Sequence, residues 1–242
     1  PELKKNKMGG ILAVGQGSEN APCFVVLEYG KEHKSKGTIC LVGKGVTFDT
    51  GGISLKPGAR MDEMKYDKSG AVAVISTMGL LADLKPVVHV VGLTPLVENN
   101  VSNNPQRPGD IITFMNGKTA EILNTDAEGR LILADALVYS AKYEPDAVVD
   151  IATLTGAVVA TLGDKASGML GNNEKLKSQI QKAGEAVGER VWELPLWDEY
   201  AEAIKGHHSD LYNIGGPYGG TITAALFLKE FVPENTPWVH LD

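Results

Sequence analysis

Short runs of apolar and β-branched residues alternate along the chain with longer stretches in which apolar residues recur every three or four positions. The short runs predict strands, and several are apolar without interruption, which is typical of strands covered on both faces of a sheet. The predicted strands are 24–29, 38–43, 87–97, 147–154 and 237–241. The longer stretches predict helices at Ser69–Leu84, Arg130–Lys142, Asn173–Gly188, Asp198–Ile204 and Thr223–Phe231.

The connections support an α/β fold. An Asn-Gly pair within 113–122 predicts a hairpin, and the Asn- and Pro-rich segment 98–110 predicts a loop. Because strands alternate with helices, we expect one domain over residues 1–242, with three α/β/α layers and a mixed, largely parallel central sheet. The chain starts without a methionine and stops directly after a predicted strand, so we expect it to be part of a longer protein. In such sheets, ligands bind at the carboxyl ends of the strands.

Composition narrows the range of functions. The chain has 242 residues, 43% of them hydrophobic, which is enough to bury a core. Its net charge of −7 and lack of a long basic run argue against nucleic acid or a membrane surface as the main partner. The longest apolar run, 147–163, contains Asp150 and is too short to cross a bilayer. Cys23 and Cys40 lie in apolar runs, and we expect both to be reduced core thiols of a cytoplasmic protein.

Three polar stretches interrupt the predicted core where strands end or give way to helices. They read LVGKGVTFDTGG (41–52), MDEMKYDKSGAVAV (61–74) and NTDAEGRL (124–131). Four carboxylates brought together from these stretches would repel one another unless cations lay among them. Because no histidine cluster accompanies them, an oxygen-rich site for Zn²⁺, Mn²⁺ or Mg²⁺ is indicated, and two ions about 3.5–4 Å apart would form a hydrolytic clamp. The carboxylates are those of Asp49, Asp67, Asp126 and Glu128.

Each stretch also has a purely structural explanation. The first could be a glycine-rich turn with a solvated lysine, Asp67 could cap the following helix, and Thr125 with Glu128 matches a capping box. The spacing of Asp126 and Glu128 would instead turn both carboxylates to one side if the backbone there is extended. Because all three stretches lie at strand ends or strand-to-helix junctions, the metal site is the better explanation of the set.

A resemblance to a known family adds to this interpretation. The segments VGKGVTFDTGGISLKP, MKYDKSGA, NTDAEGRL and DIATLTGA, in this order, resemble the leucyl aminopeptidase family, the M17 cytosolic metallo-exopeptidases. The resemblance covers essentially the whole chain. It implies a cytoplasmic two-metal enzyme that removes the first residue, preferably Leu- or Met-like, from peptides with a free N-terminus. It also implies an N-terminal domain that is absent here and a homo-hexameric full-length protein.

The resemblance further implies a ligand set for the metals. Asp49 and Glu128 would bridge two divalent ions, Asp126 would bind the tighter ion, and Lys44 and Asp67 would complete the more exchangeable one. The ions are expected to be Zn²⁺ or Mn²⁺, with Mg²⁺ or Co²⁺ as alternatives at the weaker position. As a ligand, Lys44 would be a neutral amine, which burial and a neighbouring cation favour.

The remaining matching residues would handle the substrate. Lys56 would stay cationic and polarise the scissile carbonyl. Arg130 would hold a bicarbonate ion near the backbone of Ala127 and Gly129, and the bicarbonate would act as general base toward a metal-bridging water. The residues implied to position the peptide main chain are Asn124 and Leu154, and those implied to border the pocket for its first side chain are Met64, Thr153 and Gly156.

Two other functions stay open at this point. A two-metal phosphoesterase also uses a carboxylate cluster, although a lysine ligand is unusual there. Some relatives of leucyl aminopeptidases act as DNA-binding architectural proteins, but the acidic balance of this chain is unfavourable for DNA binding.

Overall fold

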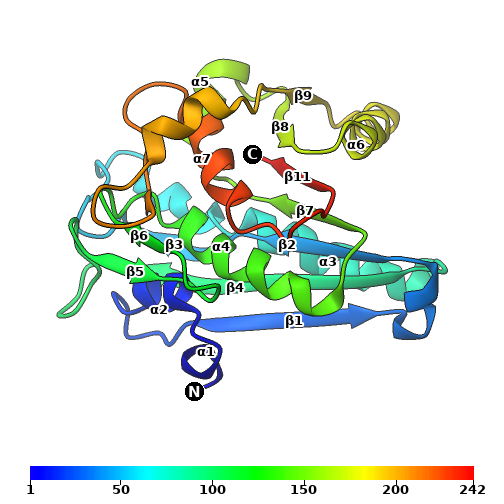
Figure 1. Ribbon diagram of the computed structural model, residues 1–242, viewed down its shortest axis with the longest axis horizontal. Helices are drawn as coiled ribbons and strands as arrows, with labels where there is room; N and C mark the ends of the chain where they lie inside the picture. The colour runs from blue at the N-terminus through cyan, green and yellow to red at the C-terminus, as the bar shows by residue number, and fades with distance from the viewer.

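The computed structural model describes residues 1–242 and contains one large and one small sheet. The large sheet has eight strands in the order β1-β4-β2-β7-β11-β8-β9, with β3 paired to β4 outside this row (Figure 1). The central pairs β4–β2, β2–β7 and β7–β11 are parallel, whereas β1 and β8 join antiparallel. The strands of the large sheet are β1 (Cys23–Tyr29), β2 (Thr38–Gly43), β3 (Gly45–Asp49), β4 (His89–Asn99), β7 (Ala147–Ile151), β8 (Ser167–Gly171), β9 (Val191–Glu193) and β11 (Trp238–Leu241). Those of the small sheet are β5 (Ile111–Thr113), β6 (Thr119–Glu121) and β10 (Leu211–Tyr212).

Helices cover both faces of the large sheet, which confirms the predicted α/β fold with a mixed, largely parallel sheet (Figure 1). Helix α3 packs on β1, β2, β4 and β7, while α2 and α4 pack on β4 from the other face and α7 packs on α4. The α-helices are α1 (Glu2–Lys5), α2 (Gly9–Gly15), α3 (Ser69–Leu84), α4 (Gly129–Ser140), α5 (Gly156–Leu162), α6 (Glu174–Val187) and α7 (Gly220–Lys229). The 3₁₀ turns are η1 (Lys31–Lys36), η2 (Met61–Tyr66), η3 (Ala141–Tyr143) and η4 (Asp198–Ile204).

Two apolar clusters on opposite faces of the sheet hold the layers together. In the larger cluster, Cys40 and Val42 of β2 lie with the buried side chains of α4. In the smaller cluster, Val74 and Met78 of α3 lie against Val90 of β4. Helix α4 is buried on all sides over its first nine residues, because it lies between the sheet and helices α2 and α7. Its N-terminus is therefore held firmly at the edge of the sheet.

The strong periodic segments were predicted well. The helix Ser69–Leu84 and the strand 38–43 have the predicted bounds, and the Asn116-Gly117 turn joins β5 to β6 as the hairpin predicted. Strand β7 ends at Ile151 rather than at residue 154, because the chain leaves the sheet there to form a loop. The helix expected at Asp198–Ile204 is a 3₁₀ turn.

Short elements and one cysteine differ from the predictions. The glycine-rich stretch after residue 44 contains β3, because its backbone pairs with β4. Strands β8, β9 and β10 and helices α1, α2 and α5 were not predicted, since they are too short for a clear periodic pattern. The expectation that Cys23 is a core thiol is wrong: Cys23 is exposed on the edge strand β1, and only Cys40 is buried.

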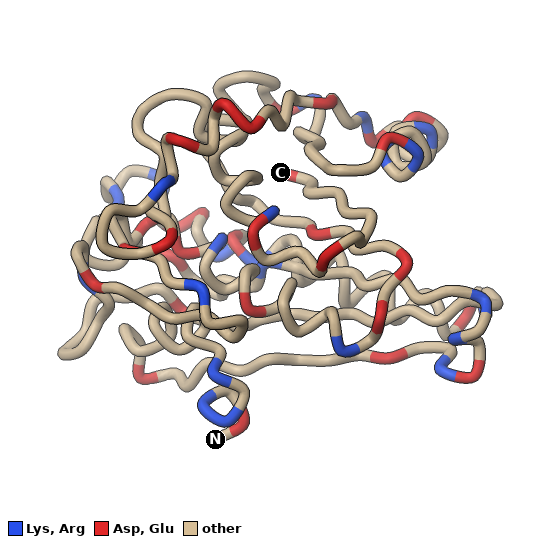
Figure 2. Tube along the Cα trace, in the orientation of Figure 1, with Lys and Arg blue, Asp and Glu red and all other residues tan.

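Charged residues are spread over the molecule. Figure 2 shows acidic and basic segments interspersed along the trace, in keeping with a net charge of −7 that arises from 30 acidic and 23 basic residues. None of the helices combines the length and the apolar character that crossing a bilayer would require.

Asp135 fastens the buried helix α4 to two other elements. Its Oδ2 accepts the backbone N–H of Ile11 at the start of α2 (3.1 Å), and its Oδ1 accepts that of Met115 after β5 (3.1 Å). Burial raises the pKa of Asp135 to about 7, although these N–H groups favour the ionised form. The carboxyl group thus keeps its proton in the folded chain at pH values where it is ionised in the unfolded chain.

This shift predicts a pH-dependent contribution of Asp135 to stability. Between about pH 4 and pH 7 the folded chain binds one more proton than the unfolded chain, so stability falls as the pH rises. The free energy of unfolding of the parent, relative to that of Asp135→Asn, should decrease by roughly 2–4 kcal/mol over this range. Urea unfolding of both proteins from pH 4 to pH 8 measures this difference. A difference that stays constant with pH would contradict the assignment.

Candidate metal centre

The carboxyl ends of β2, β3, β4, β7 and β11 lie at one edge of the large sheet, because these strands run parallel. Lys44 directly follows β2, Asp49 ends β3, and Asn99 ends β4. The loop 152–155 follows β7, and the loop 122–128 leads into the N-terminus of α4. Apart from Asn99, these segments border a cavity of about 640 Å³.

The cavity brings together nearly all of the residues that the sequence singled out. Glu128 and Gly129 do not line it, but both lie against the side chain of Lys44. The predicted residues that line the cavity are Lys44, Asp49, Lys56, Met64, Asp67, Asn124, Asp126, Ala127, Arg130, Thr153, Leu154 and Gly156.

Lys44 is buried at the centre of the first half of the site. Its Nζ donates to Asp67 Oδ1 (2.8 Å), Glu128 Oε1 (2.9 Å) and the backbone carbonyl of Thr153 (2.9 Å). These three contacts use all three N–H donors of the ammonium group. The hydroxyl of Thr153 also donates to Asp67 Oδ1 (2.8 Å), so the loop after β7 is bound into the same network.

Lys56 occupies the second half of the site. Its Nζ lies 2.9 Å from Asp49 Oδ2 and 2.5 Å from Asp126 Oδ1. Carboxylate oxygens of Asp49, Asp126 and Glu128 lie within 4.8 Å of one another, which is close enough for a shared cation. Each lysine is shared by two carboxylates, so the two lysines and four carboxylates carry two negative charges in excess if all are ionised.

This excess of carboxylates changes the protonation of the site. Burial raises the pKa of Glu128 to about 8; Lys44 opposes this rise, and the carboxylates of Asp49 and Asp67 add to it. Burial also raises the pKa of Asp67 and of Asp126. Burial alone would lower the pKa of Lys44, but the charges of Glu128 and Asp67 outweigh it and raise that pKa. Without a cation, Lys44 therefore stays protonated and is not the neutral amine that a metal ligand must be. Additional positive charge in the site would stabilise the ionised carboxylates.

The two capping explanations of the polar stretches are wrong, whereas the glycine turn of the first stretch is present at Gly51 and Gly52, with Lys44 buried rather than solvated. Asp67 does not cap α3: Lys68 holds the N-cap position, and no side chain caps that helix. The Thr125 hydroxyl donates to the Gly51 carbonyl (2.6 Å) and accepts the N–H of Ser54 (2.8 Å) instead of capping α4. The backbone at Glu128 is helical, so an extended strand does not bring Asp126 and Glu128 together as predicted. The two carboxylates nevertheless lie close to each other.

Three polar residues that hold the site were missed by the sequence reasoning. The side-chain amide of Asn99 donates to Asp49 Oδ1 (2.8 Å) and to the Thr125 carbonyl (3.1 Å). The buried Asn213 accepts the N–H of Leu123 (2.8 Å) and donates to the Asn124 carbonyl (2.6 Å). Asp242 accepts backbone N–H groups of the loop after β7. Only the place of Asn99, two residues after the predicted strand 87–97, could have pointed to such a role.

Arg130 lies in the first turn of α4 and is 6% exposed on the wall of the cavity. It makes no ion pair, and its Nε is buried without a hydrogen-bond partner. Burial lowers the pKa of Arg130 to about 10, while the charges of Glu128 and Asp242 oppose this. A buried guanidinium group without a partner can receive an anion that enters the cavity.

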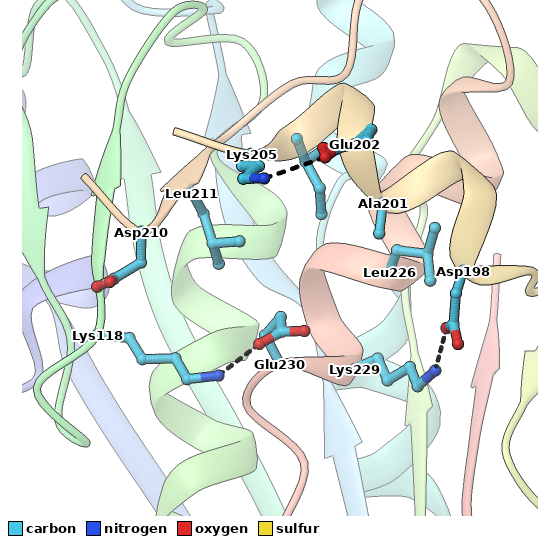
Figure 3. A pocket seen from close by; sticks show the side chains of 11 residues that line it. Lys118, Asp198, Ala201, Glu202, Lys205, Asp210, Leu211, Leu226, Lys229 and Glu230 are labelled. Atoms are coloured by element: carbon cyan, nitrogen blue, oxygen red, sulfur yellow. Dashed lines mark hydrogen bonds and ion pairs between the residues drawn. The ribbon is translucent and has the colours of Figure 1, made fainter. Parts of the chain in front are cut away.

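A second cavity, of about 500 Å³, lies between η4, α7 and β10 and contains no residue of the predicted site (Figure 3). Each of its lysines is neutralised by an acidic neighbour, and none of its buried side-chain atoms lacks a partner. The pairs are Lys118 with Glu230 (2.5 Å), Lys205 with Glu202 (3.1 Å) and Lys229 with Asp198 (3.0 Å). This balance contrasts with the excess of acids in the first cavity.

The first cavity fits divalent cations on the chemistry of its own residues. Asp67 Oδ2 and Glu128 Oε2 are buried without a hydrogen-bond partner, and two negative charges are in excess. Buried carboxylates in this state are ligands for hard or borderline cations. The fold and the site together define a metal-dependent α/β protein with its centre at the carboxyl edge of the sheet.

Comparison with known proteins identifies the family. Residues 1–242 match the model of the cytosol aminopeptidase family, catalytic domain, and the chain belongs to this family. It is 55% identical over 236 residues to a probable cytosol aminopeptidase of Chlorobaculum tepidum, covering 97% of this chain and 47% of the relative. It is 54% identical over 241 residues to a probable cytosol aminopeptidase of Pseudomonas fluorescens Pf0-1, covering 100% of this chain and 48% of the relative. It is 50% identical over 241 residues to one of Roseiflexus castenholzii, covering 100% of this chain and 49% of the relative. The family resemblance seen in the sequence is thus confirmed, and the chain spans about half the length of these relatives.

Gly129 is predicted to be essential for the placement of Lys44. A Cβ atom on Gly129 would lie 2.5 Å from Lys44 Cε, so Gly129→Ala should push the lysine away from Asp67 and Glu128. We expect the free energy of unfolding to fall by about 1–3 kcal/mol, measured by urea denaturation.

Gly79→Ala is the matched control for this substitution. Gly79 is exposed in the middle of α3, and an added Cβ would meet nothing within 4 Å. This variant should gain about 0.5–1 kcal/mol from helix propensity alone. Equal effects of the two substitutions would show that Lys44 does not depend on Gly129.

Proposed function

We propose that this chain is the catalytic part of an aminopeptidase that removes the first residue, preferably Leu- or Met-like, from peptides with a free N-terminus. The observation that carries the proposal is the convergence of four carboxylates and two lysines at one cavity, with Glu128 directly behind its wall, in a chain of the cytosol aminopeptidase family. The cytoplasmic location and the homo-hexameric assembly are proposed for the whole protein, of which this chain is the catalytic domain.

We infer that the site holds two divalent cations, Zn²⁺ or Mn²⁺, with Mg²⁺ or Co²⁺ as alternatives at the weaker position. Asp49 and Glu128 would be shared by both, Asp126 would belong to the tighter position, and Lys44 and Asp67 to the other. When bound, the cations would supply an acidified water as nucleophile and polarise the substrate carbonyl. For Lys44 to join as a ligand, its ammonium group must first give up a proton, because its pKa is raised by Glu128 and Asp67 against the effect of burial.

Lys56 is the electrophile of the proposed reaction. Burial by itself would lower the pKa of Lys56, but the carboxylates of Asp49 and Asp126 have a larger effect and raise it. The ammonium form of Lys56 is therefore stable. Its side chain is 21% exposed on the cavity wall, which lets it approach a substrate. Once its two carboxylate partners serve the cations, its N–H groups are free to donate to the oxyanion that forms from the peptide carbonyl. Losing one such donor typically costs about 3–4 kcal/mol of barrier.

Arg130 is proposed to hold a bicarbonate ion that takes the proton of the attacking water. Its guanidinium Nε has no partner, and the N–H groups of Gly129 and Arg130 in the first turn of α4 have no backbone acceptor. A helix N-terminus with a neighbouring guanidinium is a suitable anion site. The N–H of Ala127 donates to the Asn124 carbonyl (3.2 Å), so Ala127 would contribute through its position rather than through its N–H.

The cavity wall is suited to an aliphatic first side chain. Met64 of η2 and Gly156 of α5 line it, and Val158 and Val159 extend the same apolar wall. Thr153 also lines the cavity and is held by its contacts with Lys44 and Asp67. Asn124 and Leu154 also line the cavity and are proposed to position the peptide main chain.

Asp126→Asn tests the ligand assignment. The amide has the shape of the carboxylate but lacks its charge, so the full-length variant should fold normally and lose metal on dialysis. Leucyl-amide hydrolysis should fall by at least about 100-fold, as expected for loss of a major electrostatic contribution. Elemental analysis, thermal unfolding and turnover measure these effects. Asp164→Asn, which changes an exposed acid paired only with Lys165, is the control. A variant that keeps its metals and its turnover would contradict the assignment.

Arg130→Met separates function from stability. Methionine fills much of the same volume without a buried charge, so the free energy of unfolding should not decrease. Turnover of leucyl amide should drop by about 10- to 100-fold. Added bicarbonate should raise the turnover rate of the variant only at high concentration. Urea unfolding and rates in bicarbonate-free and bicarbonate-containing buffer measure both effects. Parental turnover in bicarbonate-free buffer would contradict the role of Arg130.

A further inference from the structure

Asp242 lies one residue beyond β11, and its place is set by the sheet. Its backbone N–H and carbonyl both bond to Gly168 (2.9 Å each), which continues the antiparallel pairing of β11 with β8. Because side chains alternate along a strand, Asp242 follows Trp238 and His240 on one face. Both of those side chains are anchored to the buried Asp150 of β7. The carboxylate of Asp242 is thereby directed to the chain that leaves β7, and it lines the cavity.

The carboxylate of Asp242 engages three donors of the loop after β7. Its Oδ1 accepts the backbone N–H groups of Leu154 (2.8 Å) and Thr155 (3.1 Å), and its Oδ2 accepts the hydroxyl of Thr155 (2.6 Å). The same hydroxyl oxygen accepts the N–H of Val158 as the N-cap of α5 (3.2 Å) and contacts Thr221 of α7 (2.9 Å). One carboxylate therefore joins the ends of β7 and β11 to the beginnings of α5 and α7.

This loop is directly connected to the candidate ligands. Thr153, the residue before the clamped N–H of Leu154, accepts a hydrogen bond from Lys44 Nζ at its carbonyl (2.9 Å). Its hydroxyl donates to Asp67 Oδ1 (2.8 Å). The carbonyl of Thr153 and the N–H of Leu154 belong to the same planar peptide unit, so a shift of the loop would move the contacts with Lys44 and with Asp242 together.

We propose that Asp242 is a positioning residue of this site. It holds the segment 153–155 so that Thr153 meets Lys44 and Asp67, and so that Leu154 and Gly156 face the substrate. The effect on turnover rests on the proposed aminopeptidase function, whereas the effects on the loop and on metal affinity do not. Asp242 contacts neither substrate nor metal in this proposal and acts by holding the loop.

The test compares Asp242→Ala and Asp242→Asn in the full-length protein. In Asp242→Ala, amide hydrogen exchange at Leu154 and Thr155 should be faster by at least about 10-fold, because their acceptor is lost. The Kd for Zn²⁺, measured by equilibrium dialysis, should rise, and kcat for leucyl amide should fall by about 10- to 100-fold with a smaller change in KM. Asp242→Asn keeps an oxygen acceptor for the two N–H groups and should restore most of these values.

Asp146→Ala is the matched control, because Asp146 also accepts a strand N–H, that of Thr38 (2.7 Å), at the opposite end of the sheet. It should lose stability without altering exchange at Leu154, the Kd for Zn²⁺ or kcat. If Asp242→Ala does not fold, Asp242→Ser is used in its place. The same results are expected, because the serine hydroxyl cannot accept hydrogen bonds from all three donors.

Two results would overturn the proposal: parental exchange at Leu154 and Thr155 in these variants, or faster exchange with unchanged Zn²⁺ affinity and kcat. If the parent itself hydrolyses no amino-acyl amide, the proposed function fails. Exchange and Zn²⁺ affinity then still decide the role of Asp242.

Discussion

The site is governed by the need of four partly or fully buried carboxylates, gathered beside one cavity, for positive charge. Burial raises the pKa of Glu128 to about 8 and favours the protonated forms of Asp67 and Asp126 as well. The two lysines compensate part of the negative charge, because each forms ion pairs with two carboxylates. Such an arrangement is costly for a folding chain, because charges are removed from water without complete pairing. It is well suited to a protein that binds divalent cations.

The architecture makes this convergence possible. Parallel strands place their carboxyl ends at one edge, so residues that follow β2, β3 and β7 meet although they are far apart in the chain. The buried helix α4 brings Glu128 and Arg130 to the same edge, and Gly129 leaves room for Lys44. Several polar groups without a partner lie here, namely Asp67 Oδ2, Glu128 Oε2 and Arg130 Nε. Unsatisfied buried groups of this kind reduce stability and are retained where function requires them.

The sequence predicted the periodic elements and the residues of the cavity, but not the contacts that hold them. Ser69–Leu84 and 38–43 were predicted with their bounds because their patterns extend over the whole element. Strand β3 was missed because its pairing with β4 is a long-range interaction that overrides a glycine-rich composition. Asn99, Asn213 and Asp242 were missed for a related reason: each holds a loop about 50 to 90 residues away in the chain. The four carboxylates were selected from their positions at strand ends, with capping explanations still open, and the individual roles of the site residues came from the family resemblance.

The central claim is that divalent cations, and not only lysines, balance the carboxylates of the cavity. The most direct test is the anomalous scattering of crystals soaked with Zn²⁺ or Mn²⁺. The account predicts peaks among Asp49, Asp126 and Glu128 and beside Asp67, with the Nζ of Lys56 no longer bonded to Asp49 and Asp126. A cavity without an anomalous peak at saturating metal, in which both lysines keep all their carboxylate contacts, would contradict it.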